Sequence, residues 1–360
     1  MRTIEEDMTN AADAGRSSAA DPTPTSGPLS PATFAQSDSA LAQALAERLL
    51  EVEDLLDSAV EQTASLPNES SHHLLRAGGK RVRPMLVLLA AQYGDPSHLS
   101  VSRAAAAVEL IHLATLYHDD VMDDAPMRRG APSAHAVWGN SVAILTGDLL
   151  FARASLLTAQ MGPDAVRLQA ETFERLVLGQ LNEFTGPGEG VDPVAHYLQV
   201  LADKTGSLIA ASGEFGLRYS QAPAELIPVL RDYGEKVGIA FQLADDIIDI
   251  ASEGEKSGKT PGTDLREGVP TLPVLYLQAD AAAGDADAAS VVALLESDLS
   301  TDEALERART ALVAHPALDR ARQTARSWSD AAIAALDPLP RGEVKDGLVE
   351  FARSVVDRVA

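Results

Sequence analysis

Two short acidic clusters in the sequence have the spacing of a metal-binding helix face. The first, LYHDDVMDD, places Asp119 and Asp123 four residues apart, with Asp120 beside them. On a helix the first and last of these carboxylates lie on one face, about 6 Å apart along the axis. Acidic side chains near the C-terminal end of a helix are unfavourable unless a cation neutralises them. Because the ligands are hard oxygens and the chain has no cysteine, the pattern favours Mg²⁺.

The second cluster, FQLADDIIDI, repeats the pattern in apolar surroundings. Asp245, Asp246 and Asp249 have the same relative spacing, and Gln242 precedes them on the same face. A solvated helix face seldom has so many isoleucine and leucine neighbours. Two such clusters facing each other would hold several Mg²⁺ ions, and Mg²⁺ completes its coordination shell with waters and phosphate oxygens. The pair therefore predicts a diphosphate ligand that metal bridges to both helices.

Basic residues are grouped at several places in a chain that carries a net charge of −24. The groups are GGKRVRP with Lys80 and Arg83, MRRG with Arg128 and Arg129, DKTG with Lys204 and Thr205, and SGKTPG with Lys259. Arginine binds phosphate through paired hydrogen bonds, whereas lysine acts as a point charge. We interpret Arg81, in the first group, as a solvated surface residue. The cations outnumber what one diphosphate needs, so we expect a second diphosphate on Lys80, Arg83, His112 and Arg129.

Helices must position these residues, because apolar side chains recur at steps of three and four along most of the chain. In SALAQALAERLLEVEDLLDSAV the apolar positions include Leu41, Leu45, Leu49, Val52 and Leu56. Alanine is plentiful, and no paired strands with hairpin turns are evident. The pattern predicts an all-α protein with one body, residues 39–360, in which both acidic clusters end long apolar helices. Residues 1–38 are rich in Ala, Ser, Thr, Pro and Asp, which predicts a disordered tail.

Composition excludes several classes of function. The chain has 360 residues, of which 46% are hydrophobic, and it has no cysteine. Disulfides, thiol catalysis and cysteine metal sites are therefore ruled out, and the negative net charge argues against binding to nucleic acid. No apolar run reaches the roughly 18 residues of a membrane span, and MRTIEEDMTN has the features of neither a signal nor a transit peptide. We therefore expect a cytoplasmic enzyme without a transmembrane segment.

The strings GGKRVRP, LYHDDVMDDAPMRRG, GDLLFARA, LADKTGSL, FQLADDIIDI and GKTPGTDLREGVPTLPVLY together closely resemble the trans-polyprenyl diphosphate synthases. The resemblance implies an isoprenoid-synthase helical bundle around a deep central cavity, in a homodimer. It also implies a prenyltransferase that condenses isopentenyl diphosphate head-to-tail with an allylic diphosphate such as farnesyl diphosphate. The product would be a long-chain all-trans polyprenyl diphosphate, for use in a quinone side chain. Many members have a lysine where this chain has Val269, which removes one possible phosphate contact.

The same resemblance implies a role for each group of residues. Metal binding belongs to Asp119, Asp123 and Asp245, supported by Asp120, Asp246 and Asp249. Isopentenyl diphosphate is bound by Lys80, Arg83, His112 and Arg129. The allylic diphosphate is bound by Arg128, Lys204, Thr205, Gln242 and Lys259. In catalysis Asp119 and Asp245 act on the leaving diphosphate, Lys204 and Thr205 stabilise the allylic cation, and the released diphosphate accepts the proton.

Small side chains before the first cluster predict an open path for the growing hydrocarbon. Thr115 lies one helical turn below Asp119, and Ile111 lies about two turns below, roughly 12 Å away. Ala114 sits beside Thr115, and in the resembling family these two positions often form the floor of the pocket. Because neither side chain is aromatic, we expect a product longer than geranylgeranyl diphosphate.

Several alternatives fit parts of the pattern. A terpene cyclase would normally lack GGKRVRP and carry a different second motif, and a Mg²⁺-dependent phosphohydrolase would have no use for a long channel of small residues. A non-catalytic regulatory subunit of a heteromeric synthase should have lost some of the aspartates. A geranylgeranyl diphosphate synthase would share the motifs and make a shorter product. The complete motif set favours a catalytic synthase, with the last two readings kept as alternatives.

Overall fold

The computed structural model describes residues 39–252 and 261–359. The helices expected from the sequence periodicity form throughout these residues. The longer helices are α2 (Ala40–Val60), α5 (Leu99–Met122), α7 (Asn140–Ala159), α8 (Pro163–Thr185), α11 (Ile227–Ala251) and α16 (Pro316–Ala335). The shorter ones are α3 (Ser65–Arg76), α4 (Val82–Ala90), α6 (Ala134–Trp138), α9 (Pro193–Leu201), α10 (Ser207–Tyr219), α12 (Thr263–Glu267), α13 (Leu272–Ala282), α14 (Ala286–Leu295), α15 (Asp302–Ala314) and α17 (Glu343–Asp357). Three single turns complete them: η1 (Ala91–Tyr93), η2 (Ala202–Gly206) and η3 (Ala224–Leu226). The predicted tail, residues 1–38, and Lys259 lie outside the described residues.

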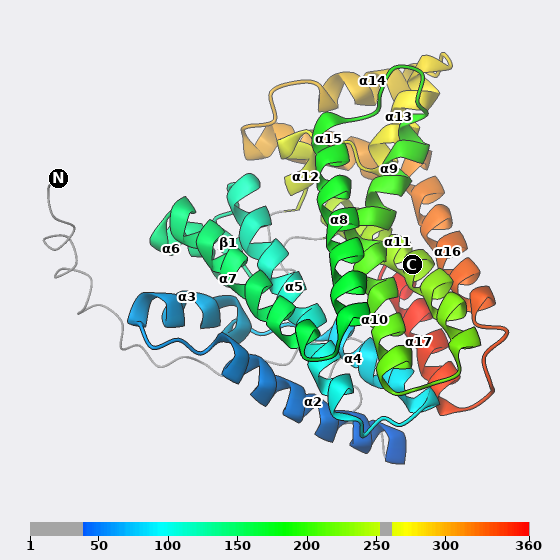
Figure 1. The fold of residues 1–360 in the computed structure, drawn as a ribbon. Helices are drawn as coiled ribbons and strands as arrows, with labels where there is room; N and C mark the ends of the chain where they lie inside the picture. The colour runs from blue at the N-terminus through cyan, green and yellow to red at the C-terminus, as the bar shows by residue number, and fades with distance from the viewer. Residues whose placement is uncertain (1–38, 253–260, 360) are drawn as a thin grey trace, which may run out of the picture.

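Two central helices carry the acidic clusters. α5 packs against α7, α4 and α10, while α11 packs against α10 and α16 (Figure 1). Alanines at 104–107 are fully buried in α5 and let neighbouring helices approach closely. α2 crosses one end of the bundle, and α12 to α15 cover the other end (Figure 1). Of the apolar positions expected in α2, Leu45, Leu49, Val52 and Leu56 are buried and Leu41 is half-buried.

A short hairpin follows α5, so the expectation of a chain without paired strands is wrong at this point. β1 (Met127–Arg128) pairs with β2 (Ala131–Pro132) in antiparallel fashion. The turn between them is Arg129–Gly130, with φ of 54° and 78°, as a two-residue hairpin turn requires. Strands of two residues are too short to produce a recognisable alternation in the sequence. The hairpin places Arg128 and Arg129 just beyond the first acidic cluster.

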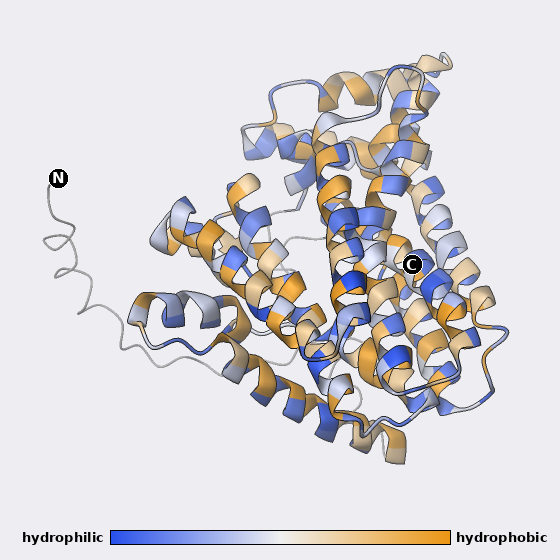
Figure 2. Ribbon diagram, in the orientation of Figure 1, coloured by the Kyte–Doolittle hydropathy of each residue, from blue (hydrophilic) through white to orange (hydrophobic). Residues whose placement is uncertain are grey.

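Two described helices, α5 and α7, are long and apolar enough to span a bilayer by length and composition alone. The most apolar stretch of α5 is 67% buried inside the protein, as in a core helix, whereas that of α7 is 39% buried. Figure 2 shows hydrophobic residues along α7 and α8, which are joined by a short turn. Neither α5 nor α7 is a clear membrane span.

Candidate active site

The first acidic cluster lies at the C-terminal end of α5. Asp119 and Asp120 belong to its last turn, while Asp123 caps the helix and donates its backbone N–H to the Asp119 carbonyl at 2.8 Å. Burial raises the pKa of Asp119 to about 6. Desolvation also raises the pKa of Asp123, although its side chain reaches the surface. Both carboxylates therefore lack full neutralisation, and a bound cation would supply it.

Asp120 has a different environment from its two neighbours. Its side chain is 0% exposed, and its Oδ1 accepts a hydrogen bond from Arg128 Nε at 2.5 Å. Its second oxygen, Oδ2, is buried and has no protein hydrogen-bond partner among the described residues. Asp120 thus fixes Arg128 of the hairpin next to the cluster, and its second oxygen can accept one more hydrogen bond.

The second cluster occupies the last turns of α11, and its three aspartates have different partners. Asp245 forms an ion pair with Arg358, the residue that follows α17, at 2.5 Å. Asp246 is buried, which raises its pKa to about 6, and its Oδ1 accepts from Gln242 Nε2 at 2.9 Å. Asp249 Oδ2 accepts from the backbone N–H of Asp264, in the first turn of α12, at 3.2 Å.

Two glutamates lie within electrostatic reach of both clusters, and Lys204 pairs with one of them. After burial, the charge of Glu183 is among the causes that raise the pKa values of Asp119, Asp123 and Asp246. Burial and then Asp123 and Asp249 raise the pKa of Glu267. Lys204 Nζ pairs with Glu183 at 2.5 Å. Burial lowers the pKa of Lys204, but the charge and hydrogen bond of Glu183 outweigh it, so the pKa is raised. Neither glutamate could be predicted from the sequence, because each is a single acidic residue in an ordinary helix.

Lys204 and Thr205 belong to a π-helical turn, η2, within an otherwise α-helical stretch. Turns of this type are rare and occur often at functional sites. Glycine permits the close packing around it, since a Cβ on Gly238 would lie 2.5 Å from Gly206 Cα. Arg175 braces the turn from α8, through Asp203 at 2.9 Å and Glu235 at 2.5 Å. The Thr205 hydroxyl donates to Gln242 Oε1 at 3.3 Å.

A second group of cations lies beside the first cluster. Burial lowers the pKa of Arg83 to about 10, and its Nε is buried without a hydrogen-bond partner in the described chain. Burial, followed by the charges of Arg83 and Arg129, lowers the pKa of His112 well below its usual value. Arg129 donates to the Leu74 carbonyl at 3.1 Å and to the Gly78 carbonyl. Like charges held together in this way favour an anionic ligand.

Lys80 lies at the border between this group and the second cluster. Burial and then the charge of Arg358 lower its pKa, while Asp245 opposes them. The structure therefore brings Arg83, His112 and Arg129 together as expected, and it places Lys80 within electrostatic reach of Asp245.

The interpretation of Arg81 as a solvated surface residue is wrong. Its side chain is 6% exposed and bonds Glu53 at 2.5 Å and the buried Glu109 at 3.1 Å. Arg81 also has φ of 48° and precedes the first turn of α4. Through Glu53 on α2 and Glu109 on α5, it ties the start of α4 to both helices. Its role is therefore to hold the loop that carries Lys80.

The three residues expected at the floor of the pocket differ in exposure. Thr115 is half-buried on the same face of α5 as His112 and Asp119, and its hydroxyl donates to the His112 carbonyl at 2.8 Å. Ala114 and Ile111 are fully buried. Thr115 is therefore the floor position most open to the site, and the deep cavity itself stays a prediction.

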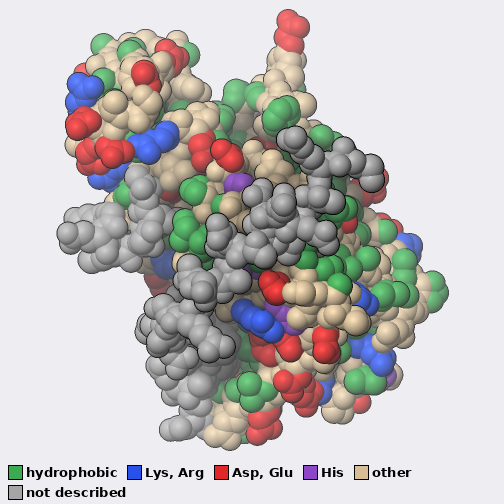
Figure 3. Space-filling model, turned by 90° about the vertical axis from the view of Figure 1, so that its left-hand side faces the viewer, with side chains coloured by type: hydrophobic (Ala, Val, Ile, Leu, Met, Phe, Trp, Pro, Cys, Tyr) green, Lys and Arg blue, Asp and Glu red, His purple; other side chains and the backbone are tan. Residues whose placement is uncertain are grey.

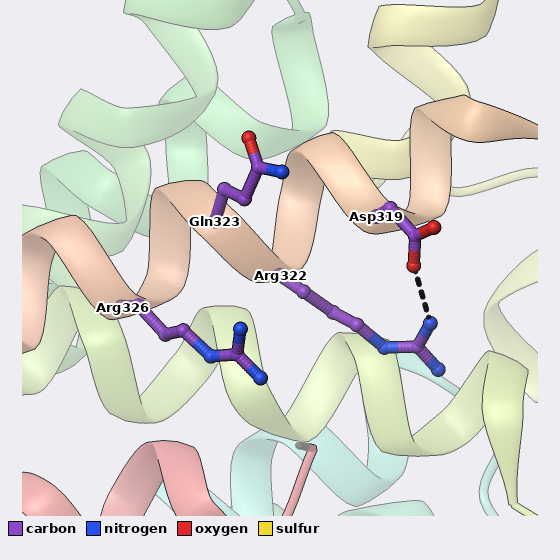
Figure 4. Close-up of a pocket in the computed structure, with 4 residues that line it drawn as sticks. All are labelled: Asp319, Arg322, Gln323 and Arg326. Carbon is purple, nitrogen blue, oxygen red and sulfur yellow. Dashed lines mark hydrogen bonds and ion pairs between the residues drawn. The ribbon is translucent and has the colours of Figure 1, made fainter.

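A surface pocket of about 340 Å³ on α16 lies apart from these groups. It is lined by Asp319, Arg322, Gln323 and Arg326 (Figure 4). Arg322 is already paired with Asp319 at 2.8 Å. None of the residues predicted to do chemistry lines it, so its chemistry differs from that of the site between α5 and α11.

Comparison with known proteins decides between the classes of enzyme that such a site could serve. The family model described as polyprenyl synthetase matches residues 65–312. The chain belongs to the polyprenyl synthetase family. It is a polyprenyl diphosphate synthase, a prenyltransferase, and the predictions of the family and of the all-α isoprenoid-synthase fold are confirmed.

Individual members of the polyprenyl synthetase family match over nearly their whole length. Nonaprenyl diphosphate synthase of Mycobacterium tuberculosis is 46% identical, covering 88% of this chain and 95% of that protein. A decaprenyl diphosphate synthase structure from Rhodobacter capsulatus is 35% identical, with a TM-score of 0.79 over 89% of this chain and 98% of that one. A geranylgeranyl pyrophosphate synthase from Corynebacterium glutamicum, complexed with calcium and isoprenyl diphosphate, is 43% identical, with a TM-score of 0.79 and coverage of 89% and 98%.

Proposed function

We propose that this synthase uses Mg²⁺ to condense isopentenyl diphosphate with an allylic diphosphate, such as farnesyl diphosphate, into a long-chain all-trans polyprenyl diphosphate. The observation that carries the proposal is that the acidic ends of α5 and α11 lie within electrostatic reach of the same two glutamates, Glu183 and Glu267. Each cluster contains a buried aspartate with a raised pKa, and Lys204 pairs with Glu183, whose charge acts on both. The separate group of Arg83, His112 and Arg129 lies close by. This arrangement provides for two diphosphates, one on metal and one on cations.

The carboxylates that would hold the metal are Asp119, Asp123 and Asp245, with Asp120, Asp246 and Asp249 in support. Among the described residues, no three acidic or histidine side chains converge closely enough to bind an ion by themselves. Mg²⁺ fits such a set, because it keeps several waters and takes further ligands from substrate phosphates. When bound, it neutralises negative charge that develops on the leaving diphosphate.

Side chains of the protein itself bind the two substrates. Arg83, His112 and Arg129, with Lys80 at the border, hold isopentenyl diphosphate. Arg128, Lys204 and Gln242 hold the allylic diphosphate, and Thr205 stabilises the allylic cation. Lys259, outside the described residues, is proposed to hold the same diphosphate. Preorganised cations at the leaving oxygens stabilise charge separation at little reorganisation cost. The double bond of isopentenyl diphosphate attacks the allylic cation, and the released diphosphate takes the proton that is lost.

The length of the product distinguishes two candidates. Similarity to the nonaprenyl and decaprenyl synthases supports a long chain, as does the absence of an aromatic side chain at Ala114 and Thr115. Similarity to the geranylgeranyl pyrophosphate synthase supports a shorter one. We favour the long chain, because neither floor residue carries an aromatic ring that would block a path along α5.

The function is tested with purified protein, Mg²⁺, farnesyl diphosphate and isopentenyl diphosphate. We expect mass spectrometry to show all-trans products that grow by whole isoprene units beyond geranylgeranyl diphosphate. Products that stop at geranylgeranyl would select the second candidate. A cyclic hydrocarbon, release of phosphate alone or no reaction would each reject the proposal, the last outcome favouring a non-catalytic subunit.

We further propose that the enzyme is a cytoplasmic homodimer that pairs through α7 and α8. Both helices expose large hydrophobic side chains, and Leu145 and Phe184 are 65% and 90% exposed. The others are Ile144, Leu156, Val166, Val177, Leu178 and Leu181. Figure 3 shows hydrophobic side chains gathered on the right-hand part of one face. An apolar surface of this kind on a charged protein is typical of an interface between subunits.

The dimer proposal predicts the effect of charges placed in this surface. The double variant Leu145→Asp, Leu178→Asp should shift the mass measured by light scattering from dimer to monomer, because burying two unpaired carboxylates is unfavourable. The matched control is Leu50→Asp on α2, at a leucine that is 67% exposed outside this surface, and it should stay dimeric. A monomeric wild type, or a double variant that remains dimeric, would contradict the proposal.

A further inference from the structure

A continuous run of three hydrogen bonds links α9 to the π-helical turn. The Tyr197 hydroxyl on α9 donates to Asp246 Oδ2. Gln242 Nε2 donates to the other carboxylate oxygen, Oδ1, at 2.9 Å. The Thr205 hydroxyl then donates to Gln242 Oε1 at 3.3 Å. The run passes through the second acidic cluster and ends at a residue proposed to stabilise the allylic cation.

The direction of each bond is set by the one before it. Asp246 accepts one hydrogen bond at each carboxylate oxygen, from Tyr197 and from Gln242 Nε2, and this fixes which end of the Gln242 amide faces it. The amide oxygen is consequently the end that faces Thr205. A threonine hydroxyl has a single hydrogen, and here that hydrogen points at Gln242. The oxygen lone pairs of Thr205 are therefore left free for a positively charged neighbour.

Tyr197 is suited to a fixed donor role. Its ring packs against the hydrophobic core, and its hydroxyl donates to Asp246. Asp246 and Thr205 are buried as well. In a buried network an unpaired polar atom is costly, so each member constrains the next. Without the Tyr197 hydroxyl, Asp246 Oδ2 would lose its donor, and the Gln242 amide could turn over.

We propose that Tyr197 is a positioning residue that orients the Thr205 hydroxyl, through Asp246 and Gln242, with its lone pairs available to the allylic cation. This role rests on the proposed function. Tyr197 acts on the substrate only through other side chains, so its loss should affect the ionisation step more than substrate binding.

The test compares steady-state constants for Tyr197→Phe and wild type. We expect kcat to fall on the order of tenfold, as for a lost buried hydrogen bond, while KM for both substrates stays within about twofold. The matched control, Tyr276→Phe, removes a hydroxyl that bonds Thr324 at 3.0 Å between α13 and α16, and it should keep the wild-type kcat. Gln242→Leu, which keeps the Tyr197–Asp246 bond and cuts the link to Thr205, should lower kcat at least as much.

A double-mutant cycle separates positioning from a general structural effect. In a Thr205→Val background, Tyr197→Phe should cause little further loss of kcat, because residues in one network are not additive. Losses that multiply, a change in KM alone or a wild-type kcat in Tyr197→Phe would each overturn the proposal. A wild-type protein that fails to lengthen farnesyl diphosphate would instead reject the function itself, before any variant is compared.

Discussion

Replacing Asp119 or Asp245 with asparagine is expected to lower turnover by about 10²–10³-fold while the protein stays folded. Each change removes a negative charge that would hold the metal at the leaving diphosphate. Asparagine keeps the size and shape of the side chain, so the packing of α5 and α11 should survive. Turnover is measured at saturating Mg²⁺ and substrate, and folding by circular dichroism and the thermal midpoint.

The matched control for this pair is Asp124→Asn. Asp124 follows the first cluster directly, its side chain is 99% exposed, and its φ of 47° is a conformation that asparagine also adopts readily. It should retain wild-type turnover. Full activity of both site variants would contradict the model in which the two acidic clusters share metal. A loss of turnover in the control as well would indicate a general effect of charge.

Thr115→Phe is expected to shorten the product to farnesyl or geranylgeranyl diphosphate while condensation continues. Thr115 is half-buried on the face of α5 that also carries His112 and Asp119, so an aromatic ring there would cross the path of the hydrocarbon. Product lengths are measured by mass spectrometry, starting from dimethylallyl diphosphate. Ala114→Phe should act in the same direction but with a larger loss of stability, because Ala114 is fully buried.

The control for this prediction makes the same substitution at an exposed threonine. Thr310→Phe on α15 changes a residue whose hydroxyl bonds only its own helix, at Glu306. Its products should match those of wild type. If Thr115→Phe still makes long chains, the residues that end growth lie on another helix.

What the sequence could predict was mostly local. Steps of three and four between leucines sufficed for α2, and repeated aspartate spacing sufficed for the ends of α5 and α11. The partners that give these residues their roles lie far away in the chain. Arg81 is 28 residues from both Glu53 and Glu109, and Tyr197 is 49 residues from Asp246. Periodicity has no information on such pairs, so the burial of Arg81 and the contribution of Tyr197 required the fold.

The ion pair between Asp245 and Arg358 has a consequence for how the enzyme matures. The two residues are 113 positions apart, and contacts over such distances are slow to form because a long loop must close first. The cation group and the first acidic cluster, which lie between residues 80 and 129, can assemble much earlier during synthesis. Asp245 meets its guanidinium partner only when α17 has docked on α11. A nascent chain would therefore have the cation group and the first acidic cluster in place before the second cluster is complete. The enzyme would become active only when folding is finished.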